Sequence, residues 1–157
     1  MINKMAQITL FNEDNPSYLL SIKKGSAEAL MNGSKPHEFR RKFEDYHRYA
    51  QVFIYITRPV RKIIGEIIFD RPIKDSIDGL CALLSQNAFD TEANLRKYLV
   101  DCDVAYALPV VSIRKFENPI SLEEIRREFG EFNPPVSYIK LDKPKYLKMR
   151  DFFKQRE

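Results

Sequence analysis

The amino-acid sequence predicts an α+β fold, a β-barrel with short helices around it, and two observations lead to this prediction. Several runs of residues are rich in β-branched and aromatic side chains and are almost continuously apolar, as strands in a closed barrel are. The segments between them carry the caps and terminal glycines of short helices. With 157 residues, the chain has the length of one domain. We expect a single domain over residues 17–157 after an N-terminal arm over residues 1–16.

The first strand is predicted over residues 18–22, and a short helix follows it. Ser26 has a side chain suited to an N-cap, and Glu28 would lie in the first turn, where a negative charge is favourable. Gly33 can adopt the left-handed conformation that ends a helix. This helix is therefore predicted to begin at Ser26 and to end just before Gly33.

Residues 33–40, called the octet below, read Gly-Ser-Lys-Pro-His-Glu-Phe-Arg, a G-x-K-x-x-E-x-R pattern that places three charged side chains at fixed offsets. The proline favours an extended chain, and the alternation over residues 37–43 predicts a strand. Because successive side chains of a strand point to opposite faces, Phe39 and Phe43 would share one face. Glu38 and Arg40 would share the other, which predicts a core on one side and a polar cleft on the other.

Two further strands are predicted over residues 52–57 and 62–69 from their β-branched and aromatic content. Gly65 inside the second run indicates a bulge or a close approach of another backbone. Two short helices, with leucines recurring on one side, are expected within residues 75–99. They would form a helical insertion that packs over one end of the barrel.

A long apolar run over residues 104–116 predicts the next strand. Pro109 interrupts it and cannot donate to a ladder, so an edge position or a bend is expected there. Ser121 and Glu124 form a capping box, which opens a helix that Gly130 closes.

A pair of prolines then favours an extended chain, which leads into the last strand, predicted over residues 136–141. Residues 142–157 are expected as a basic C-terminal helix. Tyr146, Met149 and Phe153 recur there at helical spacing and would dock on the barrel.

The formal net charge of +4 suggests an anionic partner, but most of this charge does not belong to the octet. Residues 140–157 hold seven Lys or Arg against three Asp or Glu, a surplus of four that equals the charge of the whole chain. The basicity is therefore a property of the C-terminal segment, which is consistent with phosphate contact or with a solvated helix face.

The octet resembles the signature of the activating signal cointegrator homology (ASCH) domain, a PUA-like β-barrel family considered to bind RNA or nucleosides. Further segments, in the order that this family uses, extend the resemblance over residues 17–141: Ser21-Ile22-Lys23, Tyr55-Ile56-Thr57-Arg58-Pro59-Val60, Ile64-Gly65-Glu66, Pro119-Ile120-Ser121-Leu122 and Pro134-Pro135-Val136-Ser137-Tyr138. The resemblance implies a PUA-like mixed β-barrel of about five to six strands, with short peripheral helices and a C-terminal helix.

The family resemblance also implies a ligand-binding cleft around Lys35, Glu38 and Arg40. Arg offers a planar fork of donors and Lys a point charge, and both suit phosphates and base edges. Lys23, Arg58 and Ser137 are expected at its rim, and Tyr138 is a candidate cleft residue. Thr57 and Arg58 precede Pro59 at the end of a strand, where side chains commonly ring a barrel mouth, and a plain turn is the alternative there. Tyr55 and Phe39 are further aromatic candidates for base stacking, although most aromatic residues in strands belong to a core. From spacing alone, a solvated ion-pair network on an exposed strand is the alternative.

Glu38 would be held ionised by the two cations beside it in sequence, because nearby opposite charges favour the charged form. A carboxylate paired in this way is a poor proton acceptor. We expect it to accept hydrogen bonds from an exocyclic amino group or to orient Lys35 and Arg40.

The leading functional hypothesis is an RNA-binding or nucleotide-binding ASCH domain, in RNA metabolism or in regulation linked to transcription or translation. An alternative is a small hydrolase. One branch of the family resembles an amidohydrolase acting on N4-acetylcytidine, with a Thr nucleophile at the position matching Glu38 and a Lys matching Lys35, and another branch has ribonuclease activity. Because Glu38 replaces that nucleophile, the prediction favours binding over catalysis. A protein-interaction or regulatory domain is the third hypothesis.

No metal or cofactor is expected, because Cys81 and Cys102 are far apart and His37 and His47 have no cysteine cluster near them. No stretch approaches the ~20 apolar residues of a membrane span. We therefore expect a cytoplasmic protein with reduced thiols, an RNA, nucleotide or nucleoside ligand and no membrane contact, while a protein partner stays open.

Overall fold

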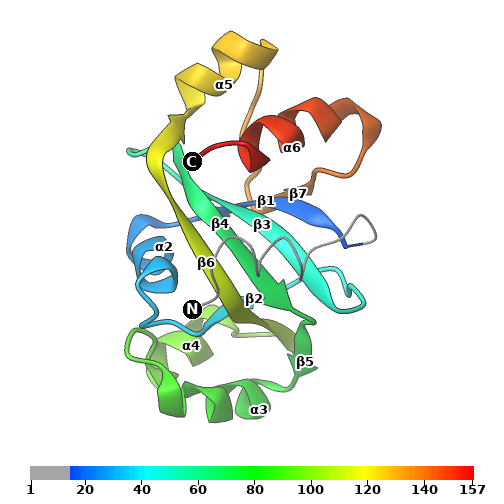
Figure 1. Cartoon of the computed structure of the whole chain (residues 1–157). Helices are drawn as coiled ribbons and strands as arrows, with labels where there is room; N and C mark the ends of the chain where they lie inside the picture. Colours follow the sequence, from blue (N-terminus) through cyan, green and yellow to red (C-terminus); the bar gives the residue numbers. More distant parts are fainter. Residues whose placement is uncertain (1–14) are drawn as a thin grey trace.

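The computed structural model describes residues 15–157, in which strands build a sheet curved into a half-barrel (Figure 1). The strands are β1 (Ser17–Ile22), β2 (His37–Arg40), β3 (Tyr49–Ile56), β4 (Lys62–Asp70), β5 (Ile73–Asp75), β6 (Ala105–Ser121) and β7 (Tyr138–Lys140). The α-helices are α2 (Lys24–Met31), α3 (Ile77–Cys81), α4 (Glu92–Tyr98), α5 (Leu122–Phe129) and α6 (Leu147–Lys154), and the 3-10 helices are η1 (Ala82–Gln86) and η2 (Pro144–Tyr146). The expected arm lies almost wholly outside the described residues.

The strand order is β2-β6-β4-β3-β1-β7, with β5 beside β6. β1 runs parallel to β3, and the other neighbouring strands pair antiparallel. The predicted α+β fold, a PUA-like mixed barrel with peripheral helices and a C-terminal helix, is confirmed. Within residues 15–157, no helix is long and apolar enough to cross a membrane.

The strand of the octet is shorter than predicted. β2 ends at Arg40, and the chain bends at the next two residues, so the alternation does not continue to Phe43. Phe39 consequently packs with the insertion, whereas Phe43 packs inside the barrel. The predicted N-cap is also wrong, because α2 begins one turn earlier with Lys23 at its N-cap, and Ser26 lies within its first turn.

Two positions predicted from the sequence to be irregular, Gly65 and Pro109, have local explanations in the sheet. At Gly65 the pairing of β4 with β6 shifts register, and a Cβ placed there would lie 2.4 Å from the carbonyl oxygen of Arg114, so the predicted close approach is confirmed. Pro109 does not lie on an edge strand. It falls between Val110, which pairs with β4, and Ala107, which pairs with β5, where no ladder bond is needed from it.

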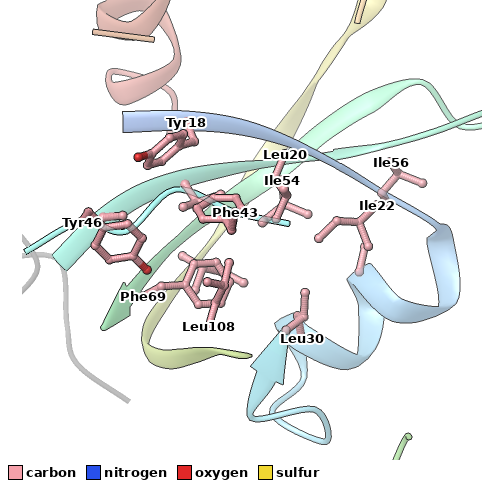
Figure 2. Close-up of a cluster of buried hydrophobic side chains, with 14 residues drawn as sticks. Tyr18, Leu20, Ile22, Leu30, Phe43, Tyr46, Ile54, Ile56, Phe69 and Leu108 are labelled. Atoms are coloured by element: carbon pink, nitrogen blue, oxygen red, sulfur yellow. The ribbon is translucent and has the colours of Figure 1, made fainter. Parts of the chain in front are cut away.

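Three hydrophobic clusters fill the molecule. The first lies inside the curved sheet and is closed by α2 (Figure 2), with Tyr18, Leu20, Ile54 and Phe69 among its buried side chains. The second lies under α5 and α6, where Met149 and Phe153 dock as predicted. The third joins the insertion of α3, η1 and α4 to β2 and β6. The insertion therefore packs over one end of the sheet, while α6 covers the other (Figure 1).

A chain of buried polar side chains runs from β1 to the C-terminal segment. Ser17 Oγ donates to Gln51 Oε1 (3.2 Å), and Gln51 Nε2 donates to Glu66 Oε2 (2.6 Å). Arg114 donates from Nε to the other Glu66 oxygen and from its amino groups to the carbonyl oxygens of Arg156 and Lys154. This network fastens the end of α6 to the middle of the sheet.

Candidate functional site

The three charged residues of the octet converge at one place. Gly33, with φ of 84°, turns the chain out of α2, and the Lys35 amide then donates to Ala29 O (3.1 Å). Glu38 stands opposite Leu108 in the ladder of β2 with β6. Its Oε1 lies 3.8 Å from Lys35 Nζ, and its Oε2 accepts from Arg40 NH1 at 3.0 Å. The sequence pattern thus forms a three-residue ionic cluster at the start of a strand.

This cluster is buried, which changes its electrostatics. The side chains of Lys35 and Glu38 are only 4% and 5% exposed. Burial raises the pKa of Glu38 above its ordinary value of 4.5, and the opposing effects of Lys35 and Arg40 do not offset it. The expectation that the flanking cations dominate was therefore wrong. That expectation considered only the charges of Lys35 and Arg40, which are close in sequence. The larger effect on the pKa comes from the loss of solvent around the Glu38 carboxyl group.

Asp90 completes the cluster from the insertion. Its Oδ2 accepts from Lys35 Nζ at 2.5 Å and from Asn87 Nδ2 at 2.9 Å. The inner site therefore contains two cations and two carboxyl groups. Nothing in the sequence identified Asp90, because it lies 55 residues from Lys35 and meets it only through the packing of the third hydrophobic cluster.

These residues line a cleft with a volume of about 830 Å³. Of the predicted site residues, it contains Lys23, Lys35, Glu38, Arg40 and Thr57. Its other walls come from β1, α2, β2, the insertion and the segment before β7, and consist of Ser21, Ile22, Gly25, Ser26, Phe39, Phe89, Asp90, Asn94, Leu95, Tyr98 and Val136. The first turn of α2 faces this space without an acidic residue, so the positive end of its helix dipole adds to the charge of Lys23.

Ser137 and Tyr138 are placed apart although they adjoin in sequence. Ser137 does not line the cleft, but its Oγ accepts from Arg40 NH2 at 2.6 Å, so Arg40 bridges Glu38 and Ser137. The Tyr138 ring turns to the opposite side, where its centroid lies 4.5 Å from that of Phe43. Neighbouring residues at the start of a strand face opposite ways, so only one of the two can serve the cleft.

The other predicted candidates differ in where they lie: on the exposed surface, in a hydrophobic cluster, or in both the cleft and a cluster. Arg58 is exposed and is not part of the cleft lining. Tyr55 is buried in the second hydrophobic cluster, under α5 and α6, and cannot stack on a ligand. Phe39 contributes to both the cleft and the third cluster.

His37 is partly buried beside Phe39, with their ring centroids 6.1 Å apart. Burial, with a smaller effect of Lys35, lowers its pKa, and its Nδ1 is buried without a hydrogen-bond partner. The described part of the chain contains no group of three or more His, Cys, Asp or Glu side chains placed to hold a metal ion.

Comparisons with known proteins agree with this architecture. No protein-family model matches the chain. An ASCH domain-containing ribonuclease from Zymomonas mobilis is 27% identical over 136 residues, which are 87% of this chain and 91% of the relative. The crystal structure of ASCH from Zymomonas mobilis superimposes with a TM-score of 0.76 at 27% identity, covering 90% of this chain and 98% of that one.

Two further structures show the same fold. A serine-to-alanine variant of the Zymomonas protein has a TM-score of 0.76 at 26% identity and covers 88% of this chain and 97% of its own. A Pseudomonas putida protein solved by X-ray crystallography has a TM-score of 0.54 at 13% identity and covers 87% and 98%. That likeness concerns the fold alone.

Proposed function

Because this chain is an ASCH domain, we propose that it binds RNA and that a nucleotide of the strand occupies the cleft around Lys35, Glu38 and Arg40. The observation that carries the proposal is the convergence of buried Lys35 and Glu38 with the partly buried Arg40 in a cleft of about 830 Å³. The size lies within the range of sites for small ligands. The likeness to a ribonuclease over 91% of that protein supports RNA as the ligand.

Each part of the cleft has a chemical role in this proposal. Arg40 and Lys35 supply charge-assisted donors for phosphate or base oxygens. The Glu38 carboxyl group accepts from, or when protonated donates to, a base edge. Lys23, at the rim beside the first turn of α2, is suited to a neighbouring phosphate.

The proposal is tested by fluorescence anisotropy with short single-stranded RNAs at two salt concentrations. We expect binding at low salt that weakens steeply as salt rises. Arg40→Ala should weaken binding by about tenfold or more, as the loss of a charged contact does. Arg71→Ala serves as the matched control, because Arg71 pairs with Asp45 on the exposed surface away from the cleft. Absence of binding at low salt would refute the proposal.

Ribonuclease activity is a second candidate function, favoured by the raised pKa of Glu38 and by the name of the relative. A carboxylate whose pKa is raised by burial is a better general base. In the ionised form, Glu38 would take the proton of a ribose 2′-hydroxyl while the 2′-oxygen bonds to phosphorus and the P–O5′ bond breaks. The 5′-oxygen takes a proton from solvent, and Glu38 returns its own to solvent, leaving a 2′,3′-cyclic phosphate. Lys35 and Arg40 would stabilise the charge on the phosphoryl oxygens.

Cleavage is distinguished from binding by Glu38→Gln. We expect this variant to keep binding RNA within a few-fold and to lose cleavage by about 100-fold or more, the contribution of a general base. A substrate with a single 2′-deoxyribose should stay intact at that position. Equal cleavage by both proteins, or cleavage of the deoxy position, would rule out this chemistry and leave the binding proposal standing.

A further inference from the structure

Exposed apolar side chains gather around the cleft. Five large hydrophobic residues in the described part of the chain are exposed, and three of these line the cleft: Phe89 (42%), Tyr98 (45%) and Val136 (100%). Two come from the insertion and one from the segment before β7. An apolar group concentrated at a charged cleft indicates a binding surface, since singly exposed apolar residues are usually scattered.

Phe89 is exposed and yet held in place by its turn. The side-chain oxygen of Asn87 accepts the backbone N–H groups of Phe89 (2.8 Å) and Asp90 (2.7 Å). The next residue along from Asn87, Ala88, donates its amide to Ser34 O at 2.8 Å, which ties this turn to the octet. The backbone that carries the ring is thus held in place, which lowers the entropy lost when a ligand covers the ring.

Phe89 and Tyr98 both lie beside charged residues of the cleft. Lys35 Nζ lies 5.5 Å from the Phe89 ring centroid, and a Cβ placed on Gly25 would lie 3.8 Å from the Phe89 ring edge. The ring therefore spans the space between the insertion and the first turn of α2. Tyr98 projects from α4, and burial raises the pKa of its phenol, with the charges of Arg40 and Glu38 nearby. The phenol oxygen is therefore partly buried, although Tyr98 as a residue is 45% exposed and lines the cleft.

We infer that Phe89 and Tyr98 are stacking platforms for unpaired nucleobases, so that the ligand is single-stranded RNA and not a duplex. This inference rests on the proposed function and deepens it. Stacking needs the face of a base, which is free in a single strand and covered in a double helix. The insertion of residues 75–99 therefore provides the base-binding wall, while the octet provides the charged wall.

A fluorescence experiment tests the contact directly, because the chain has no tryptophan. Phe89→Trp gives a single emitter on the proposed platform, and Tyr49→Trp gives one on a partly buried position of β3 that does not line the cleft. We expect a single-stranded RNA to quench the first at saturation and to leave the second unchanged. RNA that binds with wild-type affinity without quenching Phe89→Trp would overturn the inference while leaving the proposed function intact.

Affinity measurements provide the second test. Phe89→Ala and Tyr98→Ala should each weaken single-stranded RNA binding by about 5- to 150-fold, the range for loss of one stacked base, and Phe89→Tyr should keep near-wild-type affinity. The duplex of the same sequence should bind wild-type protein much more weakly. Equal affinity of both alanine variants and wild type, with folding confirmed by thermal unfolding, would refute the stacking role. Wild-type protein that binds no RNA at low salt would overturn the proposed function and this inference together.

Discussion

Lys35 Nζ lies 2.5 Å from Asp90 Oδ2, although 55 residues separate the two side chains. This ion pair joins the octet to the insertion and positions the turn that carries Phe89. It also places a negative charge beside the cation most deeply buried in the cleft. An anionic ligand that approaches Lys35 therefore competes with Asp90.

Replacing Asp90 should reveal this competition. Asp90→Asn keeps the shape of the side chain and removes its charge, so RNA affinity at low salt should increase, by up to about tenfold. Asp45→Asn, on the exposed surface, removes one negative charge elsewhere and should change the affinity little. Anisotropy titrations of the two variants decide the point, and unchanged or weaker binding by Asp90→Asn would show that the pair serves only to hold the turn.

The stability of the protein should depend on pH through Glu38. Its pKa is raised above 4.5, so the protonated form is favoured by folding. That contribution is fully present below pH 4.5 and is lost as the pH rises through the pKa of the folded state. Relative to Glu38→Gln, which cannot ionise, the wild type should therefore lose free energy of unfolding as the pH is raised from 4 toward neutrality.

Urea unfolding of both proteins at several pH values measures this difference. Exposed Glu131→Gln controls for the loss of one carboxyl group. A difference between wild type and Glu38→Gln that stays constant across the range would contradict the burial effect. Lys35, Arg40 and Asp90 are the charged groups around Glu38, and the variant leaves all three in place.

Interrupting the buried polar network that contains Glu66 and Arg114 should lower the free energy of unfolding. Arg114→Met leaves Glu66 without its cation while Glu66 is 7% exposed, which should lower the free energy of unfolding by about 3–5 kcal/mol. Adding Glu66→Leu to Arg114→Met should recover much of that loss, because the uncompensated charge disappears. Equilibrium denaturation of the single and double variants gives the answer, and a double variant less stable than Arg114→Met would indicate that the network contributes more than the charge pair.

The C-terminal helix α6 should be required for the protein to fold. Phe153 is fully buried and packs against Phe53 with ring centroids 5.5 Å apart. Phe153→Ala should lower the free energy of unfolding by about 3–5 kcal/mol, and deletion of residues 142–157 should prevent folding. Exposed Lys148→Ala, on the same helix, is the control and should change stability by about 0.5 kcal/mol or less. A deletion variant that folds and binds RNA would restore the view of this helix as a separate partner surface.

The local signals in the sequence predicted much of this fold. Ser121 caps α5 with its Oγ accepting from the Glu124 amide, Gly130 ends that helix with φ of 83°, and Gly33 ends α2. These features depend on residues within one turn of each other, which is why a sequence reveals them. The prediction of Ser26 as the N-cap was wrong, because it relied on residue type alone, whereas the extended residue that precedes α2 is Lys23 and makes no side-chain cap.

Only the part of the candidate site that the octet supplies could be predicted from the sequence. The octet identified Lys35, Glu38 and Arg40, since their offsets along one short segment bring them together. Phe89 and Asp90 could not be found in this way, because their place in the cleft depends on the packing of the insertion against β2 and β6. The pKa of Glu38 was misjudged for the same reason, as its burial comes from distant elements.

The pairing of the first strand with the last has a consequence for protein synthesis. β1 is hydrogen-bonded to β7, and Ser137, just before β7, holds the guanidinium of Arg40. Ser137 follows Arg40 by 97 residues, so a nascent chain cannot form this contact until residue 137 has emerged from the ribosome. The RNA binding proposed for this cleft should therefore require translation beyond Ser137, because a shorter nascent chain lacks the partner that holds Arg40.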